Sequence, residues 1–136
     1  MAKSLFPDEM LKSSSVEMSI DAVASKLTYF HEQLHLLHWQ TKSYAEHQAL
    51  GGLYDYVHDF KDGVVEKLMG YTGKRPGVYK LEPLSAATAD SVVSELISFA
   101  SSLRSFADSK NYQDIANLAD SLSGEAAKTK YLLTLS

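Results

Sequence analysis

Five histidines are gathered in one short stretch of this 136-residue chain. All of them fall between residues 31 and 58: they are His31, His35, His38, His47 and His58. Neutral imidazoles, together with carboxylates, suit Fe(II), Mn or Zn. The clustering therefore indicates a metal site. A solvated helix surface that carries histidines by chance is the alternative interpretation.

The stretch divides into two segments with helical spacing, and the ligand-type residues lie to one side of each. On a wheel of about 100° per residue, the three histidines of the first helix share a stripe roughly 75° from its apolar seam. The second helix has a stripe roughly 145° from its own seam, which holds His47, Asp55, His58, Asp62 and Glu66. Asp62 and Glu66 are one turn apart and can converge on one ion. Because these stripes do not point into their own bundle, a site built from them needs a second subunit.

A metal site inside the bundle is the competing arrangement. Glu32 and His35 have the Glu-x-x-His spacing of di-iron sites in helical bundles. Such sites need a second copy of the motif on another helix, and Asp55 with His58 is only a partial echo of it. The later helices supply neither the motif nor a well-placed inward carboxylate, so an internal di-iron site is disfavoured.

Four amphipathic helices position these residues. We expect them at about residues 16–41, 46–71, 89–109 and 112–134, in a bundle domain at 15–136 that follows an N-terminal arm at 1–14. In each helix the apolar residues recur three and four positions apart, a spacing that a strand does not produce. In the first helix they are Ile20, Val23, Leu27, Phe30, Leu34 and Leu37. Four helices with one seam each predict an all-α four-helix bundle.

Local signals give the expected helix ends and one irregularity. Ser14 followed by Glu17 predicts a capping box at the start of the first helix. Asn111 is expected to cap the N-terminus of the last helix. Gly51 and Gly52, inside the second helix, cost about 1 kcal/mol each relative to Ala. They suggest either the close approach of another backbone or a local bend.

The connections between the helices indicate a topology. The segment between the second and third helices has about 17 residues, at 71–87. At roughly 3.3 Å per residue it can run the length of a 25-residue helix of roughly 38 Å. The other two connections are short, so they join antiparallel pairs. A long middle crossover is the ferritin-like connection, and the length of this segment permits that topology without requiring it. A ferritin-like four-helix bundle is the expected fold.

The composition excludes several function classes. Asp and Glu outnumber Lys and Arg by 17 to 13, and a chain of net charge −4 is a poor partner for nucleic acids or anionic membranes. The chain has no cysteine, which excludes disulfides, iron–sulfur clusters and thiol catalysis. No segment has the pattern of a membrane span or a secretory signal, so a cytoplasmic location is expected. Motifs of nucleotide or hydrolase chemistry are also absent.

The histidine and carboxylate spacing resembles the Dps mini-ferritins (DNA-binding protein from starved cells). In that family a His-Trp pair ends the first helix, as His38 and Trp39 do here. A second histidine then opens the next helix, and an Asp and a Glu follow 15 and 19 residues later, which matches His47, Asp62 and Glu66. The resemblance covers roughly residues 20–70 by motif and the rest of the chain by helix count.

The resemblance implies a ferroxidase site between two subunits at a two-fold axis. His38 and His47 would come from one chain, and Asp62 and Glu66 from its mate. The ring of Trp39 would pack beside the metal.

This chain departs from the family pattern at one candidate ligand. Family members carry a further carboxylate four residues after the second histidine, where this chain has Gly51. Asp55 and His58 are the candidates to replace that ligand, and His35 is a further candidate on the first helix.

The function implied by the resemblance is oxidation of Fe(II) by peroxide or O₂, followed by storage of the iron mineral in a hollow shell. The implied partner is the chain itself, as a homodimer at least and as a dodecamer in a complete shell. Two alternatives stay open: a ferritin-like bundle without ferroxidase activity that serves as a structural or protein-interaction module, and a site for Zn or Mn built from the same residues.

Overall fold

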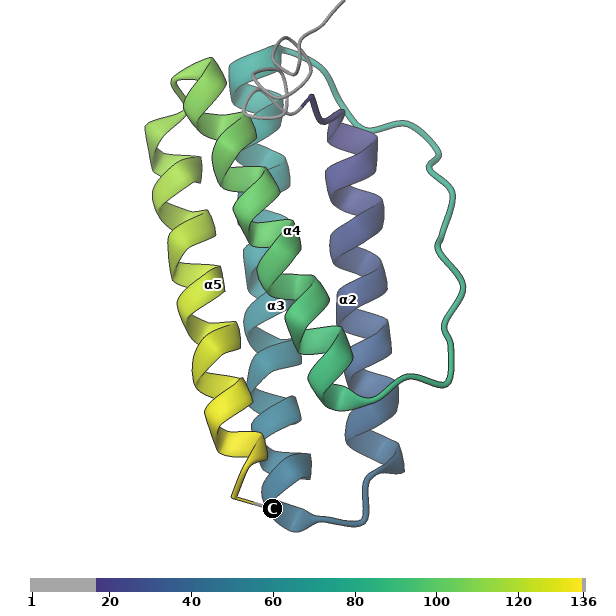
Figure 1. Ribbon diagram of the computed structural model, residues 1–136. Helices are drawn as coiled ribbons and strands as arrows, with labels where there is room; N and C mark the ends of the chain where they lie inside the picture. The colour runs from purple at the N-terminus through teal and green to yellow at the C-terminus, as the bar shows by residue number, and fades with distance from the viewer. Residues whose placement is uncertain (1–16, 136) are drawn as a thin grey trace, which may run out of the picture.

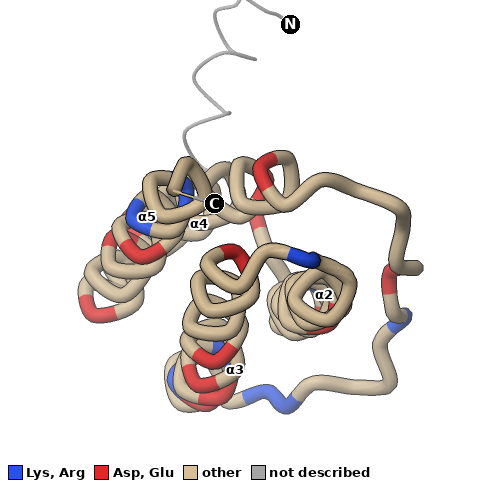
Figure 2. Tube along the Cα trace, turned by 90° about the horizontal axis from the view of Figure 1, so that it is seen from below, with Lys and Arg blue, Asp and Glu red and all other residues tan. Residues whose placement is uncertain are grey.

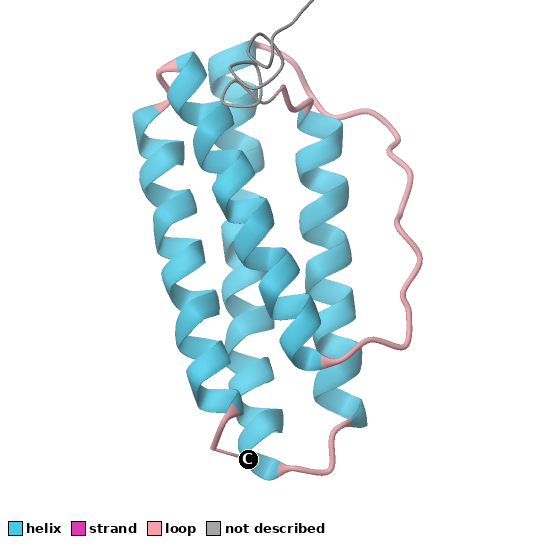
Figure 3. Cartoon of the chain, in the orientation of Figure 1, coloured by secondary structure: helices cyan, strands magenta, loops and turns pink. Residues whose placement is uncertain are grey.

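The part of the chain that the structure describes, residues 17–135, folds into four α-helices and contains no strand. In this computed structural model the helices stand side by side as a bundle (Figures 1 and 3). Their bounds are α2 Ile20–Gln40, α3 Tyr44–Thr72, α4 Ala89–Lys110 and α5 Gln113–Leu133. The predicted all-α four-helix bundle is confirmed for these residues. None of the four helices is both long enough and apolar enough to cross a membrane.

α2 begins later than the sequence pattern predicts. Its first residue is Ile20 rather than Val16. The reason is Ser19, whose backbone is extended and whose hydroxyl accepts a hydrogen bond of 3.0 Å from the N–H of Ala22. This bond satisfies one of the free donors of the first turn. The predicted capping residue Ser14 and the N-terminal arm lie outside the described residues.

The turn between α4 and α5 also differs from the prediction. Asn111 has a φ of 63° and ends α4, where its N–H donates to the carbonyl of Asp108 at 3.1 Å. The N-cap of α5 is Tyr112, which makes no capping bond through its side chain. Asparagine adopts the left-handed conformation at low cost. Its presence therefore marked the end of one helix rather than the start of the next.

The four helices form two antiparallel hairpins. α2 packs chiefly against α3 and α4 against α5, α3 also packs against α5, and α2 packs less extensively against α4. Residues 73–88, here called the crossover segment, leave α3, run along the outside of α2 and enter α4 (Figure 1). As a result α3 and α4 point in the same direction. Seen end-on, the crossover segment covers one flank of α2 (Figure 2).

Polar side chains of α2 hold the crossover segment in place. Gln33 is fully buried, and its amide donates to the carbonyl of Ser85 at 3.1 Å and accepts from the N–H of Ser85 at 2.9 Å. The hydroxyl of Ser25 donates to the carbonyl of Lys80 at 2.6 Å. These bonds satisfy backbone groups that an extended segment cannot pair within itself.

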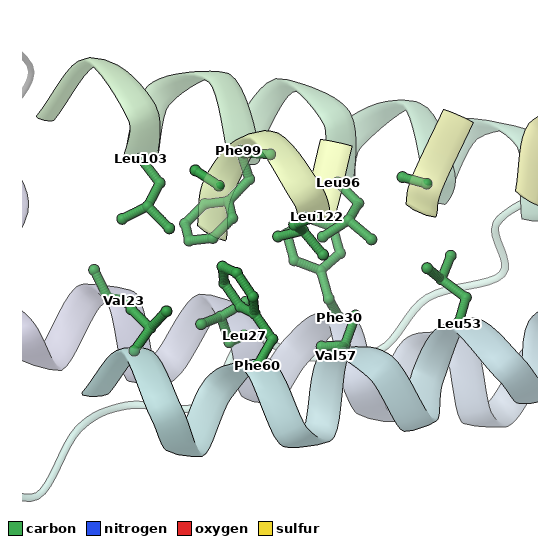
Figure 4. Close-up of a cluster of buried hydrophobic side chains, with 14 of the residues drawn as sticks. Val23, Leu27, Phe30, Leu53, Val57, Phe60, Leu96, Phe99, Leu103 and Leu122 are labelled. Atoms are coloured by element: carbon green, nitrogen blue, oxygen red, sulfur yellow. The ribbon is translucent and has the colours of Figure 1, made fainter. Parts of the chain in front are cut away.

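The hydrophobic core runs along the axis of the bundle and takes side chains from every helix (Figure 4). Phe30, Val57, Leu103 and Leu122 come from α2, α3, α4 and α5 in turn, and each is 0% exposed. Full burial of a side chain of this size contributes about 1.5–3 kcal/mol. The same packing fixes the backbones of α2 and α3 and hence the residues on their outer faces.

Candidate metal centre

The five histidines form one continuous surface on the α2–α3 hairpin. This surface, here called the histidine face, takes His31, His35 and His38 from α2 and His47 and His58 from α3. Tyr54 of α3 lies among them, with its ring centroid 4.3 Å from that of His35 and 5.1 Å from that of His38. None of the five histidines is buried, which agrees with the helical-wheel prediction that they flank the core or face away from it.

His38 and His47 form a stacked pair in which each ring is held by the other residue's backbone. Their ring centroids are 3.6 Å apart and the planes are inclined by 18°. Nδ1 of His38 lies 2.7 Å from the carbonyl oxygen of His47, and Nδ1 of His47 lies 2.8 Å from the carbonyl oxygen of His38. Because a carbonyl oxygen only accepts, each Nδ1 carries the hydrogen. In the neutral ring Nε2 then holds the lone pair that can bind a metal ion.

The short turn between α2 and α3 creates this pair. His38 lies in the last turn of α2 and His47 in the first turn of α3. The hydroxyl of Ser43 accepts from the N–H of Glu46 at 3.2 Å and starts α3, while the N–H of Thr41 donates to the carbonyl of Leu37 at 3.1 Å and ends α2. Histidines that bind metals usually donate their other ring N–H to a carboxylate or a carbonyl, which fixes the tautomer and the ring orientation. Both rings of the pair donate Nδ1–H to a backbone carbonyl in this way.

Gly51 makes room for the ring of His38. A Cβ atom at Gly51 would lie 3.1 Å from Cε1 of His38 and 3.3 Å from its Nδ1. The close approach predicted at this glycine therefore involves a side chain rather than another backbone. A Cβ atom at Gly52 would meet nothing within 4 Å. Of the two alternatives for this glycine, a close approach and a local bend, the structure thus excludes the close approach. Gly51 thus provides the seat of the His38 ring on α3.

Aromatic rings extend the histidine face at the turn. Trp39 is 65% exposed, and its ring centroid is 3.9 Å from that of His35. Tyr44 is 76% exposed and lies over His47 at 6.4 Å. Large exposed apolar groups that lie together are typical of surfaces that contact another molecule.

His31 and His58 form a second contact between α2 and α3. Their ring centroids are 5.3 Å apart, with planes inclined by 49°. Nδ1 of His31 is 3.0 Å from a carboxylate oxygen of Glu32, and Nδ1 of His58 is 3.3 Å from a carboxylate oxygen of Asp59. The role of Asp59 was missed by the sequence analysis, and Glu32 was considered only as an internal ligand. The signal for both is a histidine followed directly by an acidic residue.

The predicted acidic ligands lie elsewhere on α3. Asp62 and Glu66 are exposed, and 15 helical residues place Asp62 about 22 Å along the axis from His47. Figure 2 shows acidic positions spread along α3. Within residues 17–135 no group of three or more ligand-type side chains is close enough to hold a metal ion. One chain therefore brings the two histidines together, but not the histidines and the acids.

Two linked pKa shifts, of Tyr71 and Asp114, occur at the end of α3 away from the histidine pair. The hydroxyl of Tyr71 donates to a carboxylate oxygen of Asp114 in α5 at 2.5 Å. This bond lowers the pKa of Asp114 and raises the pKa of Tyr71. Both groups tie α3 to α5 and are not part of the histidine face.

Comparison with known families places the chain. No curated protein matches it. Residues 38–133 match a family described as a family of unknown function (DUF5856). The matched range runs from the stacked histidine pair to the end of α5 and exceeds half of the chain. The protein therefore belongs to the DUF5856 family.

Proposed function

We propose that this protein is a Dps-like iron-binding protein that takes up Fe(II) between two copies of the chain. His38 and His47 of one copy and Asp62 and Glu66 of the other are the ligands. The iron is the substrate, and its oxidation leads to storage or detoxification. The parallel α3 and α4 helices and the crossover segment between them support a ferritin-like topology for this bundle.

The observation that carries the proposal is the reciprocal anchoring of His38 and His47. Both Nδ1 atoms are occupied by backbone carbonyl groups, so both Nε2 atoms are left for a ligand. Ordering the two rings costs conformational entropy. Because the folded chain has already ordered them, binding of an ion does not add this cost. Imidazole with carboxylate is a donor set that suits iron.

The stacking favours two ions rather than one. Nearly parallel rings 3.6 Å apart keep their lone pairs in separate planes, so the two do not converge on a common point. In sites with two metals the ions are about 3.5–4 Å apart. The pair is therefore suited to one ion on each imidazole, with acids from the second copy binding both.

The second copy is required by distance. An ion on His47 is out of reach of Asp62 in the same chain, because about 22 Å of helix separates them. If two α3 helices lie antiparallel across a two-fold axis near Asp55, His47 of each copy faces Asp62 and Glu66 of the other. The exposed rings of Trp39 and Tyr44 lie on the face that such a partner would cover.

The chain supplies ligands rather than a nucleophile or a general base. Two Fe(II) ions give one electron each to one peroxide molecule, whose O–O bond breaks. With two water molecules this yields two ferric oxyhydroxide units, FeO(OH), and releases four protons to solvent. The four side chains hold the ions and leave coordination positions open for the oxidant. Access to the ions is controlled by the partner surface that completes the site.

Fe(II) oxidation by the full-length protein tests the proposal. We expect Asp62→Ala/Glu66→Ala to lower the peroxide-dependent rate about tenfold or more, as measured by the absorbance of Fe(III). Glu125→Ala on α5 is the matched control and should oxidise iron at the wild-type rate. A double variant as fast as the wild type would refute the assignment. On size exclusion the protein should elute as a dimer or as a dodecamer, and a monomer at working concentration would also contradict it.

Binding of Zn or Mn at the same residues, without iron oxidation, is the second candidate function. Gly51 favours it, since the ring of His38 lies against the position where the further carboxylate of the Dps mini-ferritins would begin. Metal analysis of protein purified without added metal separates the two: bound Zn or Mn with no Fe(II) oxidation supports the second.

A further inference from the structure

His31 and His58 differ from the stacked pair in how their rings are anchored. Each donates its Nδ1 hydrogen to the carboxylate of the next residue in the chain, Glu32 at 3.0 Å and Asp59 at 3.3 Å. At neutral pH a carboxylate only accepts, so Nδ1 is the donor and Nε2 of the neutral ring is free. A carboxylate in this position orients the imidazole and raises its basicity as a metal ligand.

The two rings are also spaced for one ion. An imidazole bound through Nε2 at about 2.0–2.1 Å has its centroid about 3.2 Å from the ion, so two rings at a tetrahedral angle have centroids about 5 Å apart. The observed separation is 5.3 Å, with planes inclined by 49°. The stacked pair, at 3.6 Å, is too close for this arrangement. The two pairs on the histidine face are thus suited to different binding modes.

The surroundings leave this pair accessible. The side chain of His31 is 16% exposed and that of His58 is 62% exposed. No third ligand-type side chain of the described residues completes the group. Structural zinc sites use four protein ligands, so a site with two leaves the remaining positions to water.

We propose that His31 and His58 form a second, separate cation site that binds one divalent transition-metal ion, such as Zn²⁺, through both Nε2 atoms. Glu32 and Asp59 are positioning residues that hold the rings. In the single chain, waters fill the other coordination positions. The site lies within one chain and does not rest on the proposed iron chemistry or on a partner.

Zinc titration of the full chain by calorimetry tests this site. In a His38→Ala/His47→Ala background, which removes the stacked pair, one Zn²⁺ per chain should still bind. Adding either His31→Ala or His58→Ala should weaken that binding about tenfold or more, because one imidazole alone remains. Mg²⁺, which prefers oxygen ligands, should not bind measurably at this pair. Zinc binding of unchanged affinity after the replacement of His58 would overturn the proposal.

A second comparison guards against a background that does not fold. His31→Ala in the otherwise natural chain removes the other ring of the pair and should lower the number of bound Zn²⁺ ions by one, with unchanged helix content. Because His31 is not among the candidate iron ligands, this variant should leave the Fe(II) oxidation rate at the wild-type value, so a failure of this site and a failure of the proposed ferroxidase are distinguishable. An unchanged number of bound ions would refute the site.

The positioning role of the carboxylates has its own readout. Glu32→Gln and Asp59→Asn keep the side-chain size but remove the charge that makes the imidazole a better ligand. Each should weaken zinc binding by about tenfold, while the number of bound ions stays the same. If both variants bind zinc with the affinity of the unsubstituted chain, the carboxylates do not position the rings.

Discussion

The two hairpins of this bundle bury the same kind of side chain and present different chemistry to solvent. The α4–α5 hairpin has no histidine, and its surface is held by ion pairs such as that of Arg104 with Asp108 and Asp120. The α2–α3 hairpin presents all five histidines in ring contact. The two hairpins therefore differ in their surface residues and not in the kind of side chain that they bury. One hairpin completes the core, and the other also carries the candidate ligands.

Removing a core ring should affect the whole bundle far more than removing a ring from the histidine face. Phe30→Ala deletes a fully buried side chain and should lower the free energy of unfolding by about 3–5 kcal/mol. His58→Ala, the exposed counterpart, should change it by no more than about 0.5 kcal/mol. Urea denaturation followed by circular dichroism measures both. Similar losses for the two variants would contradict the separation of core and face.

Two neighbouring glycines allow a matched test within α3. Gly52→Ala gains helix propensity and meets nothing within 4 Å, so it should stabilise the protein by about 0.5–1 kcal/mol. Gly51→Ala places a Cβ 3.1 Å from Cε1 of His38 and should lose most of that gain, because the ring must move. Thermal unfolding of the two variants side by side gives the difference. An equal gain would show that the seat of His38 is loose.

The smallest expected effect is on pH dependence at the other end of α3. The pKa of Asp114 is lowered chiefly by the hydrogen bond from Tyr71. A depressed carboxyl pKa stabilises the fold above the pKa of the unfolded chain, near 4, and that stabilisation is lost as the pH falls through the lower folded value. Tyr71→Phe should therefore raise the pKa of Asp114 and cost stability at neutral pH but not in strong acid. An NMR titration of the Asp114 carboxyl measures the shift, and an unchanged pKa would contradict the assignment.

The core was predictable from the sequence because apolar spacing repeats over many turns. Seam residues such as Val23, Leu27 and Leu34 are fully buried, as predicted. The helix ends were harder to predict, because each depends on a single residue that can cap either end of a helix. Ser19 rather than a residue before it caps α2, and Asn111 closes a helix because it accepts a positive φ.

The candidate site was predictable only in part. The resemblance to the Dps mini-ferritins pointed to His38 and His47 as ligands from one chain, but the exchange of hydrogen bonds between their rings and backbones depends on the three-dimensional path of the turn. The seat that Gly51 provides for a ring depends on the same path. The assignment of Asp62 and Glu66 stays a prediction, since their proposed partners belong to another molecule.

The reciprocal hydrogen bonds between His38 and His47 allow the turn to fold before any metal ion binds. Zinc fingers are unfolded until their ion arrives, because the ion itself closes the fold. Here the backbone carbonyls of His38 and His47 already close the turn. A chelator should thus empty the ligand pair without unravelling the hairpin, and the empty protein should be ready to receive its next cation without refolding.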